Sequence, residues 1–163
     1  MTQAVAGKLT LENQLHQALE KEQFVLPYHP KLHRVTGMIT GVEALIRWND
    51  LQKGLIAPAL FIPLLEETGM IHEVGRWALR KAIEDYLRWR ALGLAAVPVA
   101  VNVSALQLHG RNFVQEIARA ISVDPFAAAG LRLDITESLI LGHIATSIDR
   151  LRASRARGLA LAI

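Results

Sequence analysis

Residues 41–48, GVEALIRW, place a carboxylate and a guanidinium in a segment that is otherwise apolar. Side chains alternate along a strand, so Glu43 and Arg47 are predicted on one face and the apolar residues on the other. A carboxylate buried alone is costly, so this face needs a cation, hydrogen-bond donors or water. Glu43 could bind a metal ion, and Arg47, roughly 6–7 Å further along the strand, could hold a phosphate. Taken alone, Arg47 also fits an ordinary ion pair with Glu43.

Two later strands each carry one oxygen donor. The segment VPVAVNVS (97–104) is apolar except near Asn102. In LRLDIT (131–136), Asp134 points to the face of the strand opposite to that of its apolar neighbours. Together with Glu43 these residues offer two carboxylates and an amide, which suit Mg²⁺ or Mn²⁺ better than zinc. Each of them, considered singly, also fits a strand cap or a loop anchor.

A helix and a hairpin are predicted at the start of the chain. Apolar residues recur with helical spacing over about 10–22, behind Thr10 as a possible N-cap. The strands 24–33 and 38–48 flank a short turn in which Gly37 can adopt the required conformation, so they are predicted to pair as a hairpin.

After the hairpin, helices and strands alternate. The predicted elements are a helix over 57–69, a helix over 71–93, a strand over 97–104, a helix around 113–121, a strand over 131–136, a helix around 144–151 that ends by Gly158, and a strand over 159–163. This alternation predicts an α/β fold with a parallel sheet, in which the first hairpin is an antiparallel exception. Functional groups of such sheets lie at the C-terminal ends of the strands.

Composition narrows the classes of function. The chain has 163 residues, 52% of them hydrophobic, and a net charge of +3. No cysteine is present, which excludes disulfides, thiolate catalysis and zinc–cysteine sites in this chain and is compatible with a reducing cytosol. The basic residues are scattered, so no DNA or RNA partner is predicted. No apolar run approaches the roughly 18 residues needed to span a bilayer, and we expect a soluble, cytoplasmic protein.

With these residues in view, the chain resembles the EAL domain family, bacterial phosphodiesterases that open cyclic di-GMP to the linear dinucleotide pGpG. GVEALIRW is similar to the signature that names the family. Four further segments are similar in the same order: LENQLHQALEKEQFVLPYHP, GLIAPALFIPLLEETGMI, VAVNVSALQL and LRLDITES. The resemblance covers residues 9–163 and leaves 1–8 as an N-terminal extension.

The resemblance implies a TIM-like (β/α) barrel with one antiparallel strand, incomplete here because the chain ends in the fifth parallel-type strand. It also implies that Mg²⁺ or Mn²⁺ is held by Glu43, Asn102 and Asp134. Glu43 and Glu137 would be catalytic, Glu137 by steadying the loop after the fifth strand.

At the substrate, the resemblance implies contacts from Arg47 and His29. Two residues depart from the usual family pattern: His29 stands where glutamine is usual, and Asp134 stands where glutamate is usual. The family's double-aspartate motif, a lysine, a general-base glutamate and a late glutamine are expected beyond Ile163. The 163-residue chain alone is therefore expected to be inactive, and to self-associate or form a homodimer.

Two alternatives remain open. The chain could be a catalytically degenerate EAL-like module that binds cyclic di-GMP or a protein partner. It could also be an unrelated metal-dependent TIM-barrel enzyme, although that hypothesis does not account for five similar segments in one order.

Overall fold

A computed structural model describes residues 2–135, 149 and 160–162. Its elements are α1 (Thr2–Glu20), β1 (Phe24–Val25), β2 (Tyr28–Leu32), β3 (Ile39–Ala44), β4 (Arg47–Asp50), β5 (Gly54–Ile56), α2 (Pro58–Thr68), α3 (Ile71–Ala91), β6 (Val99–Asn102), α4 (Ala105–His109), α5 (Phe113–Ile121), α6 (Ala127–Gly130), β7 (Leu131–Asp134) and β8 (Ala160–Ala162). The helix predicted around 144–151 lies outside the described residues. None of the described helices is long and apolar enough to cross a membrane.

The strands form two sheets. One has the order β2-β3-β6-β7-β8, in which β2 runs antiparallel to β3 and the remaining neighbours are parallel. This confirms the predicted α/β sheet with an antiparallel hairpin at its start. Among the described residues β8 is the fifth strand of this sheet but only the fourth of the parallel set, so the prediction of a fifth parallel strand miscounted by one. The other sheet, β1-β4-β5, is antiparallel and small.

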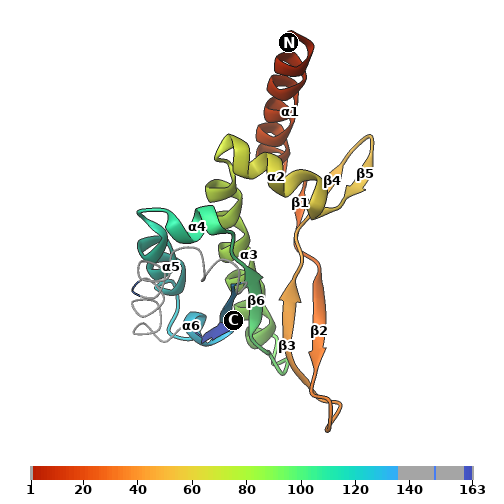
Figure 1. Cartoon of the computed structure of the whole chain (residues 1–163). Helices are drawn as coiled ribbons and strands as arrows, with labels where there is room; N and C mark the ends of the chain where they lie inside the picture. Colours follow the sequence, from red (N-terminus) through yellow and green to blue (C-terminus); the bar gives the residue numbers. More distant parts are fainter. Residues whose placement is uncertain (1, 136–148, 150–159, 163) are drawn as a thin grey trace.

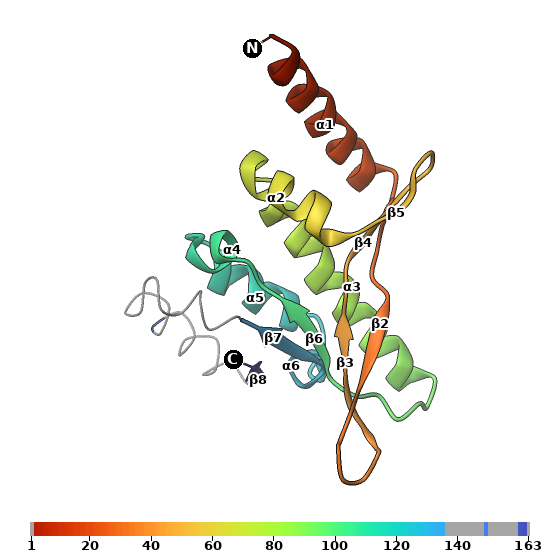
Figure 2. The same cartoon turned by 45° about the vertical axis from the view of Figure 1, so that its right-hand side comes forward.

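The two faces of the five-stranded sheet differ in polarity. Its apolar face is fully or almost fully buried at Val99, Val101, Leu131 and Leu133, where α3 packs along β6 and β7 (Figure 2). The opposite face carries the polar side chains, because successive residues of a strand point to opposite sides. Helix packing on one face therefore leaves the other face free for chemistry.

Helix α1 begins earlier than the sequence predicted. It starts at Thr2, and Thr10 lies inside it, where the Thr10 hydroxyl donates to the Ala6 carbonyl at 2.8 Å. The prediction of Thr10 as an N-cap was wrong because a threonine hydroxyl can bond to the preceding helical turn as readily as it can cap a helix. Helix α1 and the tip of the β2–β3 hairpin project from opposite ends of the molecule (Figure 1).

Turn and stop signals were predicted correctly at two glycines. Gly37 in the hairpin and Gly69 after α2 have φ of 67° and 77°, a left-handed conformation that other residues adopt at a cost. Pro58 is the first residue of α2, as predicted. Strand β5 and the short helices α4 and α6 were not predicted.

A buried carboxylate ties β2 to α3. Asp85 is 5% exposed and accepts hydrogen bonds from the Tyr28 hydroxyl at 2.6 Å, from Lys81 Nζ at 3.0 Å and from Arg88 Nη2 at 3.1 Å. The Tyr28 ring also packs edge-on against Trp89, with centroids 5.0 Å apart. These contacts fix β2 through the face that carries Tyr28, while His29 and Lys31 lie on its opposite face.

Gly130, the last residue of α6, provides a test of this packing. A Cβ at Gly130 would collide with the ring of Tyr86, which is 4% exposed and cannot swing into solvent. We expect Gly130→Ala to lower the free energy of unfolding by about 1–3 kcal/mol, measured in urea. Gly7→Ala is the control, because its Cβ would meet no atom within 4 Å in α1; it should stabilise by up to about 1 kcal/mol. Equal losses in both variants would contradict the packing argument.

Candidate functional site

Glu43, Asn102 and Asp134 lie on one face of three neighbouring strands. Glu43 is paired in register with Ala100, two residues before Asn102, and Asn102 is paired with Asp134. Residues paired in this way point to the same side of a sheet. Asn102 Nδ2 donates to Glu43 Oε1 at 3.4 Å. The structure therefore brings together the three oxygen donors that the sequence predicted.

Lys31 joins this group and was missed in the sequence. Its ammonium donates to Asp134 Oδ2 at 3.1 Å, with the lysine side chain 40% exposed and the aspartate side chain 19% exposed. Lys31 is two residues from His29 on the same face of β2, so strand alternation alone could have placed it on the polar side.

The Lys31–Asp134 contact shows that the sheet is curved. Strands β3 and β6 separate β2 from β7, so a flat sheet would hold β2 and β7 about 14 Å apart. A lysine side chain reaches about 6 Å from its Cα and an aspartate side chain about 3 Å, so with the 3.1 Å contact they fall short of this span even when both point straight along the sheet. The ion pair thus requires the sheet to curl around its polar face. Such a contact depends on tertiary curvature, and no local sequence pattern reveals it.

The residues present fit a hard divalent cation as part of a ligand set. Asp134 Oδ1 is buried and has no hydrogen-bond partner among the described residues. Burial of an unpaired carboxylate oxygen is costly, and a bound cation would offset that cost. Asn102 uses its nitrogen on Glu43 and so keeps its amide oxygen for another partner. Within the described ranges no three His, Cys, Asp or Glu side chains cluster to hold a metal, so two carboxylates and an amide are what this part of the chain supplies.

His29 lies beside Glu43. It is paired with Glu43 in the register of β2 and β3, and its side chain is exposed. Arg132 is paired with Ala100, in the same row of the sheet, and was also missed in the sequence. Both basic side chains therefore belong to the polar face, and Glu137 lies outside the described residues.

Arg47 is placed differently from the prediction. GVEALIRW is not one strand: β3 ends at Ala44, and Arg47 begins β4, which pairs with β1 in the small sheet. The expectation that Glu43 and Arg47 share a strand face was therefore wrong, because the chain changes sheets between them. Arg47 Nη1 donates to the Ile46 carbonyl at 2.9 Å, and no ion pair joins it to Glu43 in the described structure.

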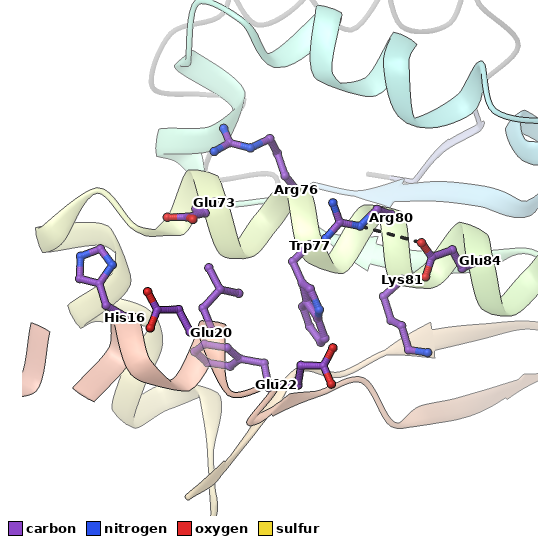
Figure 3. A pocket seen from close by; sticks show the side chains of 11 residues that line it. His16, Glu20, Glu22, Glu73, Arg76, Trp77, Arg80, Lys81 and Glu84 are labelled. Atoms are coloured by element: carbon purple, nitrogen blue, oxygen red, sulfur yellow. Dashed lines mark ion pairs between the residues drawn. The ribbon is translucent and has the colours of Figure 1, made fainter. Parts of the chain in front are cut away.

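A cavity of about 920 Å³ lies elsewhere, between the end of α1 and α3 (Figure 3). Its arginine and lysine side chains already have acidic partners: Arg80 faces Glu84 at 3.9 Å, and Arg76 and Lys81 each pair with a carboxylate at about 3 Å. None of the predicted site residues lines this cavity. We assign it no chemistry, since side chains of both charges line it and its arginine and lysine side chains are already paired.

The sequence matches the EAL domain family over residues 12–163. The bifunctional diguanylate cyclase/cyclic di-GMP phosphodiesterase MucR of Pseudomonas aeruginosa is 38% identical over 156 residues, which make up 96% of this chain and 23% of MucR. The oxygen sensor protein DosP of Escherichia coli is 31% identical over 163 residues, 100% of this chain and 20% of DosP.

Among solved structures, the PaMucR phosphodiesterase in complex with c-di-GMP superposes with a TM-score of 0.89 at 38% identity. The match covers 94% of this chain and 62% of that structure. The chain thus spans about a fifth to a quarter of the length of the two curated relatives. It shares its fold with the PaMucR structure over 94% of its own length.

Proposed function

The chain belongs to the EAL domain family, and from this premise we propose that the polar face of its five-stranded sheet forms part of a site that hydrolyses cyclic di-GMP to linear pGpG. The observation that carries the proposal is the convergence of Glu43, Asn102 and Asp134 on that face. MucR and other relatives are named as cyclic di-GMP phosphodiesterases, and PaMucR has been solved with c-di-GMP. We also propose a TIM-like barrel, which the curvature of the sheet and the similarity to PaMucR support.

Phosphodiesterases of this family are metal-dependent, and we propose Mg²⁺ or Mn²⁺ for this chain. Glu43 and Asp134 would hold the cation with two negative charges and Asn102 with its amide oxygen, since hard cations prefer such oxygen ligands. A bound cation would acidify water and neutralise charge on the phosphate. In the reaction water adds to phosphorus, one phosphorus–oxygen ester bond breaks, and the departing oxygen takes up a proton.

For substrate binding we propose Arg47 and His29, each toward the phosphates. The Arg47 guanidinium donates to a carbonyl at 2.9 Å, and a phosphate is a stronger acceptor that it could bind with two parallel hydrogen bonds. Arg47→Ala is expected to raise KM about tenfold or more and to leave kcat nearly unchanged, because it removes ground-state binding. Steady-state kinetics would measure both constants in a complete EAL domain that contains residues 1–163. A fall in kcat at constant KM would show that Arg47 acts on the transition state instead.

A second candidate function is binding of cyclic di-GMP without turnover. It is favoured by the two departures from the family pattern, His29 and Asp134, because Asp134 is shorter than the usual glutamate by one methylene. Titration of a complete domain that contains residues 1–163 with cyclic di-GMP by calorimetry, together with chromatography for pGpG, separates the two functions. Binding without pGpG from a complete domain would favour the binding module, and pGpG formation that depends on Mg²⁺ or Mn²⁺ would favour the enzyme.

We propose that the 163-residue chain on its own is inactive and self-associates. In the described part of the chain β2 and β8 form open edges of the large sheet, and the β2–β3 hairpin exposes several apolar side chains. Open edges and exposed apolar groups favour association between copies. Light scattering should therefore report a mass of a dimer or larger, and no pGpG should form. A monomer that turns over cyclic di-GMP would contradict both expectations. The cytoplasmic location expected from the sequence remains a prediction.

A further inference from the structure

The two oxygens of the Asp134 carboxylate have different surroundings. Oδ2 accepts a hydrogen bond from the Lys31 ammonium at 3.1 Å. Oδ1 is buried and has no partner among the described residues. Lys31 comes from β2, which is separated from β7 by the two strands β3 and β6 of the curved sheet, so the fold brings this lysine to the carboxylate from the far side of the site. Its charge is partly screened, since 40% of its side chain is exposed.

This asymmetry has a consequence for any cation that Asp134 binds. An ammonium beside one carboxylate oxygen takes up one of its lone pairs and repels a cation there, so a cation binds more readily to the other oxygen. Mg²⁺ and its analogue Mn²⁺ accept a single carboxylate oxygen in a compact octahedral shell, whereas Ca²⁺ takes six to eight oxygens and commonly uses both oxygens of a carboxylate. The ammonium at Oδ2 therefore disfavours the binding through both oxygens that Ca²⁺ commonly uses and Mg²⁺ does not need.

We propose that Lys31 is a positioning residue that sets the metal preference of this site, by holding Asp134 Oδ2 and leaving Oδ1 as the single oxygen for a cation. The proposal rests on the metal site of the proposed function and adds the residue that selects among cations. Lys31 acts through Asp134 and need not touch the cation or the substrate.

The test measures the affinity of the full 163-residue chain for metals alone. Free Mn²⁺ is followed by electron paramagnetic resonance, and Mg²⁺ and Ca²⁺ are added as competitors to obtain both dissociation constants. Lys31→Met should shift the ratio of the Ca²⁺ constant to the Mg²⁺ constant toward Ca²⁺ by about fivefold or more, because Oδ2 becomes available to the larger ion. The ratio is the informative quantity, since loss of a positive charge alone raises the affinity for both divalent ions to a similar extent.

Three further variants complete the design. Lys31→Arg keeps a donor for Oδ2 and should retain the wild-type ratio. Lys53→Met removes the same charge from the exposed β4–β5 turn and should leave the ratio unchanged. Lys31→Ala repeats the test with a shorter side chain, and circular dichroism confirms that each variant is folded.

The outcomes separate this inference from the proposed function. If the wild-type chain binds none of the three cations, both the metal site and the role of Lys31 are overturned. If the wild-type chain binds Mn²⁺ and Mg²⁺ but the ratio is unchanged in Lys31→Met and Lys31→Ala, only the role of Lys31 is overturned. An equal shift in Lys53→Met would also overturn it, since the effect would then be one of overall charge.

Discussion

Replacing Glu43 with glutamine is expected to reduce cyclic di-GMP hydrolysis at least about 100-fold, because several kcal/mol of charge stabilisation is lost with a metal ligand. Glutamine keeps the size of the side chain and an oxygen that can still accept the hydrogen bond from Asn102 Nδ2. The substitution therefore removes the charge while preserving the local structure. In the 163-residue chain the same change should weaken Mn²⁺ binding about tenfold or more.

Turnover can be measured in a hybrid in which residues 1–163 replace the matching part of the MucR phosphodiesterase domain, to which this chain is 38% identical. Glu84→Gln is the matched control, because Glu84 is an exposed carboxylate on α3 whose one ion-pair partner in the described part of the chain is Arg80 at 3.9 Å. The control should retain full activity. Equal turnover by the Glu43→Gln hybrid and the unsubstituted hybrid would rule out a metal role for Glu43.

The largest expected effect on stability is that of Asp85→Ala. Asp85 is 5% exposed and accepts three hydrogen bonds, so its loss removes a buried acceptor, leaves the Tyr28 hydroxyl without this partner and opens space beneath β2. We expect the free energy of unfolding to fall by about 2–4 kcal/mol, measured from urea transitions.

Glu84→Ala, one residue earlier on the same helix, is the control for Asp85→Ala. It removes the same charge from a side chain that is 60% exposed, and should change stability by no more than about 0.5 kcal/mol. Similar losses in both variants would show that the charge of α3, and not the buried network, is responsible.

The network also predicts a dependence on pH. Burial, and then the hydrogen bond to Asp85, raise the pKa of Tyr28 well above its ordinary value. The folded protein thus holds this proton more tightly than the unfolded chain, so the stabilisation is complete below about pH 10 and declines as the pH rises further. Tyr28→Phe should lessen that decline, which unfolding measurements from pH 9 to pH 11 would detect.

Local periodicity was sufficient to predict one part of the site. Asn102 and Asp134 were assigned to the polar face because side chains alternate along a strand, and the register of β6 and β7 shows them side by side. The longer helices α2 and α3 and the strands β6 and β7 likewise followed in order from apolar spacing, with the turn at Gly37 and the helix stop at Gly69. The family similarity drawn from five short segments is confirmed by the match over residues 12–163.

Other features depended on contacts distant in sequence. The break between Ala44 and Arg47 has no proline or glycine to mark it, and it arises because β4 pairs with β1 and not with the large sheet. The pairing of Asp85 with Tyr28 joins residues 57 positions apart. The contact of Lys31 with Asp134 spans 103 positions and requires the sheet to curve. None of these could be obtained from patterns within one segment.

The central claim is that Glu43, Asn102 and Asp134 together hold a divalent cation on the polar face of the sheet. The most direct test is an anomalous difference map from crystals of the chain grown with Mn²⁺, recorded at the manganese absorption edge. We expect a peak within coordination distance of all three side chains, with Lys31 still bonded to Asp134 Oδ2. A peak at another place on the protein, or no peak with Mn²⁺ present in excess, would contradict it.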